Sequence, residues 1–79
     1  MLDLSKLHPG FVIHRAVSAK GRTTKTRVFK PMFKNRCDVC AKIICAHGVK
    51  KEVGGGATLK RWCLECAKPE LADLGIQCS

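Results

Sequence analysis

The stretch RWCLECAKPEL, residues 61–71, holds two cysteines three positions apart, directly before a segment that reads as the start of a helix. A second pair lies upstream in CDVC, residues 37–40. A Cys-x-x-Cys turn directs both sulfurs at one point, and two such turns supply the four soft ligands that tetrahedral Zn²⁺ prefers. The two pairs therefore predict one closed, structural zinc site. Its predicted ligands are Cys37, Cys40, Cys63 and Cys66.

The size of the chain makes such a site useful for stability. The protein has 79 residues, with three Phe, one Trp and no Tyr. A chain of this length forms one domain and buries only roughly 60% of the surface that its unfolded state exposes. Small domains of this kind usually need disulfides or a metal in addition to their core.

Disulfides and redox chemistry are the two rival uses of the cysteines. A redox pair would need a helix start in a βαβ setting, and it would leave the other pair unexplained. Disulfides need an oxidising compartment, whereas the opening MLDLSKLHPGFVIHR does not resemble a secretory signal. No stretch approaches the roughly 20 apolar residues of a membrane span. We therefore expect reduced thiols in a cytoplasmic or nucleoid-associated protein without a membrane partner.

Two further cysteines lie outside the pairs. Cys45 ends the apolar run KIIC and is expected to be a small buried residue, while Cys78 is expected to be lightly packed. His47 is expected to lie in a solvated loop. An alternative site of three cysteines and one histidine would use Cys37, Cys40, Cys45 and His47. That arrangement leaves three cysteines without a role, so the two pairs are favoured.

The segments around the pairs predict a hairpin and a helix. KIIC (residues 42–45) and ATLKRW (57–62) read as short strands, and AHGVKKEVGGG (46–56) reads as the turn-rich connection between them. The helix is expected to begin at Ala67 with Cys66 as its cap, because Pro69 is tolerated in a first turn but would break a helix that begins at Leu64.

Gly75 is expected to end this helix at its C-terminal side. Helical periodicity places three apolar residues on its buried face. These residues are Ala67, Leu71 and Leu74.

The order knuckle, hairpin, knuckle, helix over residues 37–74, carried by CDVC, RWCLEC and the helix, resembles the treble-clef zinc fingers. The resemblance covers residues 37–74 and implies a treble-clef-like finger. Together with a basic N-terminal β-hairpin, expected from residues 1–36 themselves, it would form a small α+β zinc-stabilised domain. A basic segment, residues 1–36, and a four-cysteine zinc-finger segment, residues 37–79, would pack as one domain. A zinc ribbon, with the second knuckle on a hairpin, is the alternative. Treble clefs include nucleic-acid binders, adaptors and nucleases, so the fold does not decide the function.

The first half of the chain is strongly basic. The formal net charge is +9, and the stretch from His14 to Arg36 contains no Asp or Glu. FVIHRAVS (11–18) and TKTRVFK (24–30) read as strands joined by a turn at Gly21. The cations of this stretch are Arg15, Lys20, Arg22, Lys25, Arg27, Lys30, Lys34 and Arg36.

Such a cationic hairpin predicts binding to the phosphates of nucleic acid, either DNA or RNA, since each contact releases condensed counterions. Lys20, Arg22 and Lys25 are expected at its tip. The setting would be transcription, its regulation or a ribonucleoprotein. The alternative is docking on an acidic protein surface, such as that of a polymerase. Phe29 and Trp62 are expected in the core.

An enzymatic function is not expected. Only six residues are acidic, and no histidine is paired with a nucleophile. The zinc would be fully ligated by protein, so it would have no open position for a substrate. We therefore expect no small-molecule substrate and no catalytic residues.

Overall fold

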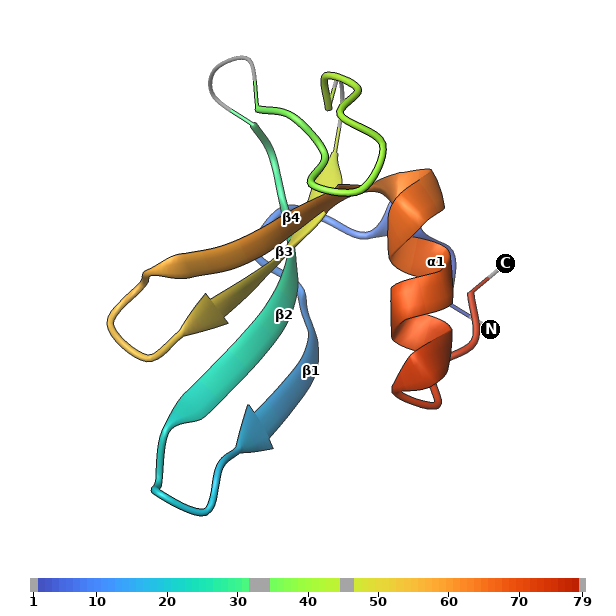
Figure 1. Ribbon diagram of the computed structural model, residues 1–79. Coiled ribbons are helices and arrows are strands. Elements are labelled where there is room, and N and C mark those ends of the chain that lie inside the picture. The colour runs from blue at the N-terminus through green and yellow to red at the C-terminus, as the bar shows by residue number, and fades with distance from the viewer. Residues whose placement is uncertain (1, 32–34, 45–46, 79) are drawn as a thin grey trace.

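The computed structural model describes residues 2–31, 35–44 and 47–78 (Figure 1). A short 3-10 helix, η1 (Leu4–Lys6), precedes four strands and one α-helix. The strands are β1 (Val12–Val17), β2 (Thr23–Phe29), β3 (Gly48–Val53) and β4 (Thr58–Cys63), and they form one antiparallel sheet in the order β1-β2-β3-β4. The helix α1 (Leu64–Asp73) follows β4 directly and lies beside the sheet (Figure 1). The predicted α+β class is confirmed at this level.

The first hairpin agrees with its prediction. β1 and β2 pair from Val12↔Arg27 to Val17↔Thr23, and Gly21 adopts a φ of +79° in the turn. The turn is closed by the N–H of Ser18, which donates to the carbonyl of Arg22 at 2.8 Å. The structure therefore contains the N-terminal basic hairpin that the sequence predicts.

The second hairpin differs from its prediction. β3 lies inside residues 46–56, which were expected to be a connection, and only Gly54–Gly56 form the turn to β4. The reason is packing: Val49 is fully buried and lies directly opposite Trp62 of β4. The expected strand at 42–45 is wrong for its described residues, because Ile43 makes only an isolated bridge to Arg36. Cys45 lies outside the described residues.

The helix begins earlier than predicted. It starts at Leu64 with Cys63 as its N-cap residue, so Pro69 lies inside the helix. Pro69 cannot donate to the carbonyl of Glu65, but both residues are exposed, and water can bind that carbonyl instead. The predicted break at Pro69 is therefore wrong.

The end of the helix agrees with the prediction. Gly75 has a φ of +82° and donates to the carbonyl of Ala72 at 2.9 Å. The N–H of Ile76 donates to the carbonyl of Leu71 at 2.9 Å, which completes a Schellman motif. Leu74, which was expected on the buried face, is 46% exposed because it is the C-cap residue, beyond the last helical turn.

The core lies between α1 and the sheet. Ala67 and Leu71 of the helix are almost completely buried against Val49 and Trp62. Phe29 is also buried in this cluster, so the expectation for both aromatic residues is confirmed. Leu4 completes the cluster from the N-terminal segment, and the N–H of Leu2 donates to the carbonyl of Gln77. The first and last described segments therefore lie together beside α1 (Figure 1). Among the described residues, no helix has the length and apolar character needed to cross a membrane.

Candidate functional site

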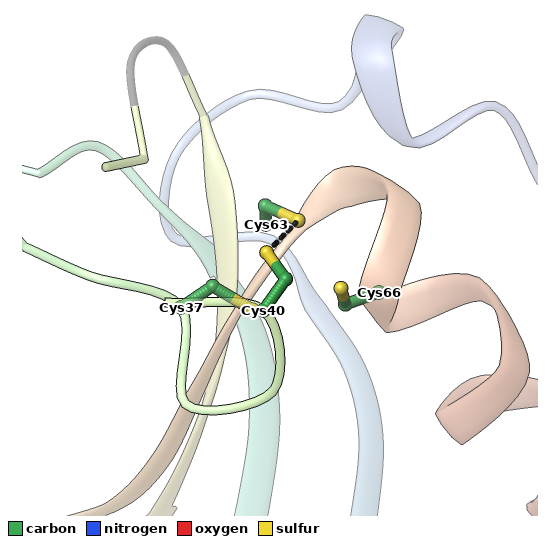
Figure 2. Close-up of side chains that lie close together, drawn as sticks. All are labelled: Cys37, Cys40, Cys63 and Cys66. Atoms are coloured by element: carbon green, nitrogen blue, oxygen red, sulfur yellow. Dashed lines mark hydrogen bonds between the residues drawn. The ribbon is translucent and has the colours of Figure 1, made fainter. Parts of the chain in front are cut away.

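The two cysteine pairs meet at the end of the sheet next to α1 (Figure 2). Their sulfur atoms all lie within 4.8 Å of one another. Cys37 and Cys40 belong to a turn before β3, which we call the cysteine turn (residues 37–41), while Cys63 ends β4 and Cys66 lies in the first turn of α1. Sequence segments far apart are thus brought together at one point.

The donor set fits a tetrahedral metal ion. The Sγ atoms of Cys40 and Cys63 are 3.8 Å apart. Four sulfurs at about 2.3 Å from a central zinc ion would be separated by about 3.8 Å, so this pair already has the required separation. The described cysteines are all free thiols, and no disulfide joins them. Four soft sulfur donors at these separations could hold one metal ion, for which zinc is the plausible choice.

The cysteine turn is held by its own backbone. The N–H of Ala41 donates to the carbonyl of Cys37 at 2.9 Å, and the N–H of Val39 donates to the Sγ of Cys37 at 3.4 Å. Ala41 adopts a φ of +63°, a conformation that residues other than glycine seldom adopt. Arg36 supports the same turn, because its Nη1 donates to the carbonyl of Ala41 at 3.0 Å.

A pair of hydrogen bonds fastens the cysteine turn to β4. The N–H of Asp38 donates to the carbonyl of Arg61 at 3.0 Å, and the N–H of Arg61 donates to Oδ2 of Asp38 at 2.8 Å. This pair fixes the position of Cys37 and Cys40 relative to Cys63. This role of Asp38 was not predicted, because the two middle residues of a Cys-x-x-Cys turn follow no general pattern.

The four sulfurs do not ionise alike. Burial raises the pKa of Cys37, but hydrogen bonds from backbone N–H groups of Cys40, Cys63 and Val39 outweigh burial and lower the pKa to about 6. The neighbouring thiol of Cys63, together with burial and the other two thiols, raises the pKa of Cys66 to about 12. Cys37 therefore ionises more readily than Cys66. A bound cation would favour the thiolate form of all four cysteines and displace the remaining protons.

The basic residues predicted to bind nucleic acid fall into three groups. Lys20 and Arg22 lie exposed in the β1–β2 turn. Lys30 and Arg36 are exposed in the segment between β2 and the cysteine turn, and Lys34 lies outside the described residues. The remaining three belong to the strands. These are Arg15 of β1 and Lys25 and Arg27 of β2.

The strand register brings these three together on one face of the sheet. Arg15 pairs directly with Lys25, so their side chains share a face. Arg27 is two residues further along β2 and shares that face. The opposite face carries Val49 and Trp62, which pack against α1. We call the face without the helix the open face; its charged residues are Arg15, Lys25, Arg27, Lys50, Glu52 and Arg61.

Two cations of the open face, Lys50 and Arg61, were missed in the sequence. They lie outside the acid-free stretch, and β3 was not recognised as a strand. The alternation of the segments GVKKEV and TLKRWC could have indicated which of their cations share a face.

Comparisons with protein-family models, with curated proteins and with solved structures found no match to this chain. The resemblance of residues 37–74 to treble-clef fingers therefore stays a prediction.

Proposed function

We propose that the protein is a small zinc-finger protein that binds the backbone of nucleic acid through its basic β1–β2 hairpin. Zinc would be held by the four clustered cysteines and would have a structural role, because a complete set of four protein ligands leaves no position for a substrate. Binding rather than catalysis would be its activity, in transcription regulation or in a ribonucleoprotein.

The order of the elements supports the more specific proposal of a treble-clef-like zinc finger. The cysteine turn, the β3–β4 hairpin, Cys63 and α1 follow one another, and Cys66 lies in the helix. A zinc ribbon would place both cysteines of the second pair on a hairpin, so a treble-clef-like arrangement is favoured.

The observation that carries the nucleic-acid proposal is the charge of the β1–β2 hairpin. Lys20, Arg22 and Lys25 are all exposed, and the stretch from His14 to Arg36 holds no acidic residue that could neutralise them. Exposed cations gathered on one hairpin favour phosphate contacts, each of which adds about 0.9 to the salt dependence of log K on duplex DNA.

Charge reversal at the hairpin tests this function. The triple variant Lys20→Glu, Arg22→Glu, Lys25→Glu is expected to lose most of its affinity for DNA and RNA while it stays folded, although Lys25→Glu, opposite Glu52, lowers its stability slightly. The matched control reverses Lys6, Lys42 and Lys68, which lie outside the hairpin and carry the same total charge, and it is expected to bind more strongly than the hairpin variant. Equal affinities for the two variants would contradict the proposal.

A second experiment distinguishes binding to nucleic acid from docking on an acidic protein surface. The wild-type protein is titrated with DNA and with polyglutamate of similar total charge over a range of salt concentrations. Tighter binding to DNA with a steep salt dependence is expected. Equal or tighter binding to polyglutamate would contradict the nucleic-acid proposal and favour docking on protein.

A further inference from the structure

The open face carries a row of three cations that crosses three strands. Arg27 of β2 pairs directly with Lys50 of β3, and Lys50 pairs directly with Arg61 of β4. Like charges directly opposite one another destabilise a sheet, so the row costs stability instead of adding it. A second row, Arg15 and Lys25, lies two residues further along the same face.

Two carboxylates offset part of this charge, one on Glu52 and one on Asp38, whose Oδ2 accepts from the backbone N–H of Arg61 at the edge of the sheet. Glu52 accepts a hydrogen bond from Nε of Arg27, and its other oxygen lies 3.8 Å from Nζ of Lys50. Two carboxylates cannot neutralise the five cations of both rows. The open face therefore keeps an excess of positive charge on β1, β2, β3 and β4 together.

The row also borders a groove. Lys50 and Arg61 line it together with Arg27, and its other walls come from the N-terminal segment at Pro9 and from Asn35. Phe29, the aromatic residue of this groove, is 6% exposed and lies beneath Nζ of Lys50, which is 5.3 Å from the ring centre. Among its described residues, the groove thus presents charge rather than an exposed aromatic ring.

We infer that the open face binds the backbone of double-stranded DNA, with Lys50 and Arg61 contacting phosphates in addition to the hairpin cations. This inference rests on the proposed nucleic-acid function and extends the contact surface to β3 and β4. Neighbouring strands lie about 4.8 Å apart, so the row spans about 10 Å, and the two rows are about 7 Å apart. A patch of this size can contact several phosphates, because a duplex carries one negative charge about every 1.7 Å along its axis.

Duplex DNA is the ligand that suits a surface whose described strand residues offer cations and no exposed aromatic ring. Single-strand binders combine cations with aromatic residues on which bases stack. A duplex hides its bases and presents one negative charge about every 1.7 Å along its axis, so cations alone can hold it. Binding on the open face would therefore depend steeply on salt and hardly on sequence.

Neighbouring residues of opposite orientation provide a matched control. Lys51 and Lys60 are adjacent in sequence to Lys50 and Arg61, but their side chains lie on the face toward α1. The controls also resemble the test residues in their contacts: Nζ of Lys60 lies 5.6 Å from the Trp62 ring centre and 3.9 Å from a Glu70 oxygen. Arg61 holds the cysteine turn through its backbone, which a side-chain substitution leaves in place.

The experiment compares the double variants Lys50→Gln/Arg61→Gln and Lys51→Gln/Lys60→Gln with the wild type. Each is titrated with a mixed-sequence DNA duplex of about 20 base pairs at several salt concentrations. The open-face variant is expected to bind about tenfold or more weakly, and its salt slope is expected to fall by about 2. The control variant is expected to stay within about twofold of the wild type. Zinc content and thermal unfolding establish that both variants are folded.

The other possible results distinguish failure of the proposed function from failure of this inference alone. A wild type that binds no nucleic acid would overturn the proposed function and this inference together. A wild type that binds, with equal losses in both double variants or no loss in the open-face variant, would overturn the inference alone. Tighter binding to a single strand of the same length than to the duplex would overturn the choice of ligand.

Discussion

The cysteine turn prepares one sulfur for a metal ion through backbone hydrogen bonds. Burial raises the pKa of Cys37, yet the N–H groups around its sulfur lower the pKa to about 6. The pKa of Cys66 is raised instead, to about 12, so Cys37 ionises more readily than Cys66. The spacing of the cysteines predicted which residues meet. It could not predict the bonds between Asp38 and Arg61, because these depend on the position of β4 beside the turn.

Ala41 is the strained residue of this turn, with a φ of +63°. An alanine in a left-handed conformation costs roughly 1–2 kcal/mol, which glycine avoids at some expense in the entropy of the unfolded chain. We expect Ala41→Gly to stabilise the protein by about 1 kcal/mol in denaturant unfolding. The control Ala72→Gly, at an exposed position of α1, should destabilise it by about 1 kcal/mol. Destabilisation by both substitutions would show that Ala41 is not strained.

Among the elements, the two hairpins differ in how well the sequence indicates them. β1 and β2 are bounded by turn residues and rich in branched side chains, and they were predicted correctly. β3 contains two lysines and a glutamate that resemble a loop, and only its pairing with both β2 and β4 makes it a strand. The early start of α1 could not be predicted either, since the exposure of Glu65 and Pro69 that makes the proline tolerable is a tertiary property.

Gly48 is the first residue of β3, and substitution at this position tests how closely Ile44 and Phe29 pack against the strand. A Cβ atom there would lie 2.9 Å from side-chain atoms of Ile44 and Phe29 and from the carbonyl oxygen of Trp62. We therefore expect Gly48→Ala to destabilise the protein by about 1–3 kcal/mol in denaturant unfolding. At Gly54 the nearest such atom is 3.8 Å away, so Gly54→Ala should change stability much less. Equal effects at the two positions would contradict this packing.

Glu52 joins β2 to β3 and makes stability depend on pH. Its hydrogen bond from Arg27 lowers the pKa of this carboxyl below the ordinary 4.5, against the opposing effect of burial. A lowered pKa in the folded state means that Glu52 contributes stability above about pH 4.5, and that this contribution is lost as the pH falls through the folded-state value.

The measurement for Glu52 is the difference in unfolding free energy between the wild type and Glu52→Gln at several pH values. The variant should be less stable by about 1–3 kcal/mol at neutral pH, and the difference should shrink in acid. Taking the difference removes effects that both proteins share, such as loss of metal. Glu65→Gln, whose side chain is 84% exposed, serves as the control and should show little difference. If the difference in unfolding free energy between the wild type and Glu52→Gln did not change with pH, the role of the carboxylate would be contradicted.

The four cysteines connect elements of the molecule that its small hydrophobic core alone would hold only weakly. The cysteine turn, the end of β4 and the start of α1 all meet at the four sulfurs (Figure 2). The same α1 covers one face of the sheet, and the cations of the open face lie on the other. We infer that zinc fixes the helix against the sheet and thereby the shape of the proposed DNA-binding face. The class of fold and the clustering of the four cysteines could be predicted from the sequence. The joining of both hairpins into one sheet could not, because it depends on contacts between strands distant in sequence.

We propose that one zinc ion bound by the four cysteines maintains this fold. The most direct measurement is a titration of Zn²⁺ into chelator-treated, reduced protein, followed by two-dimensional NMR spectra of the backbone amides and by metal analysis. We expect poorly dispersed spectra without metal and a fully dispersed spectrum that is complete at one equivalent of zinc. A dispersed spectrum that is already present without metal and unchanged by zinc would contradict the claim.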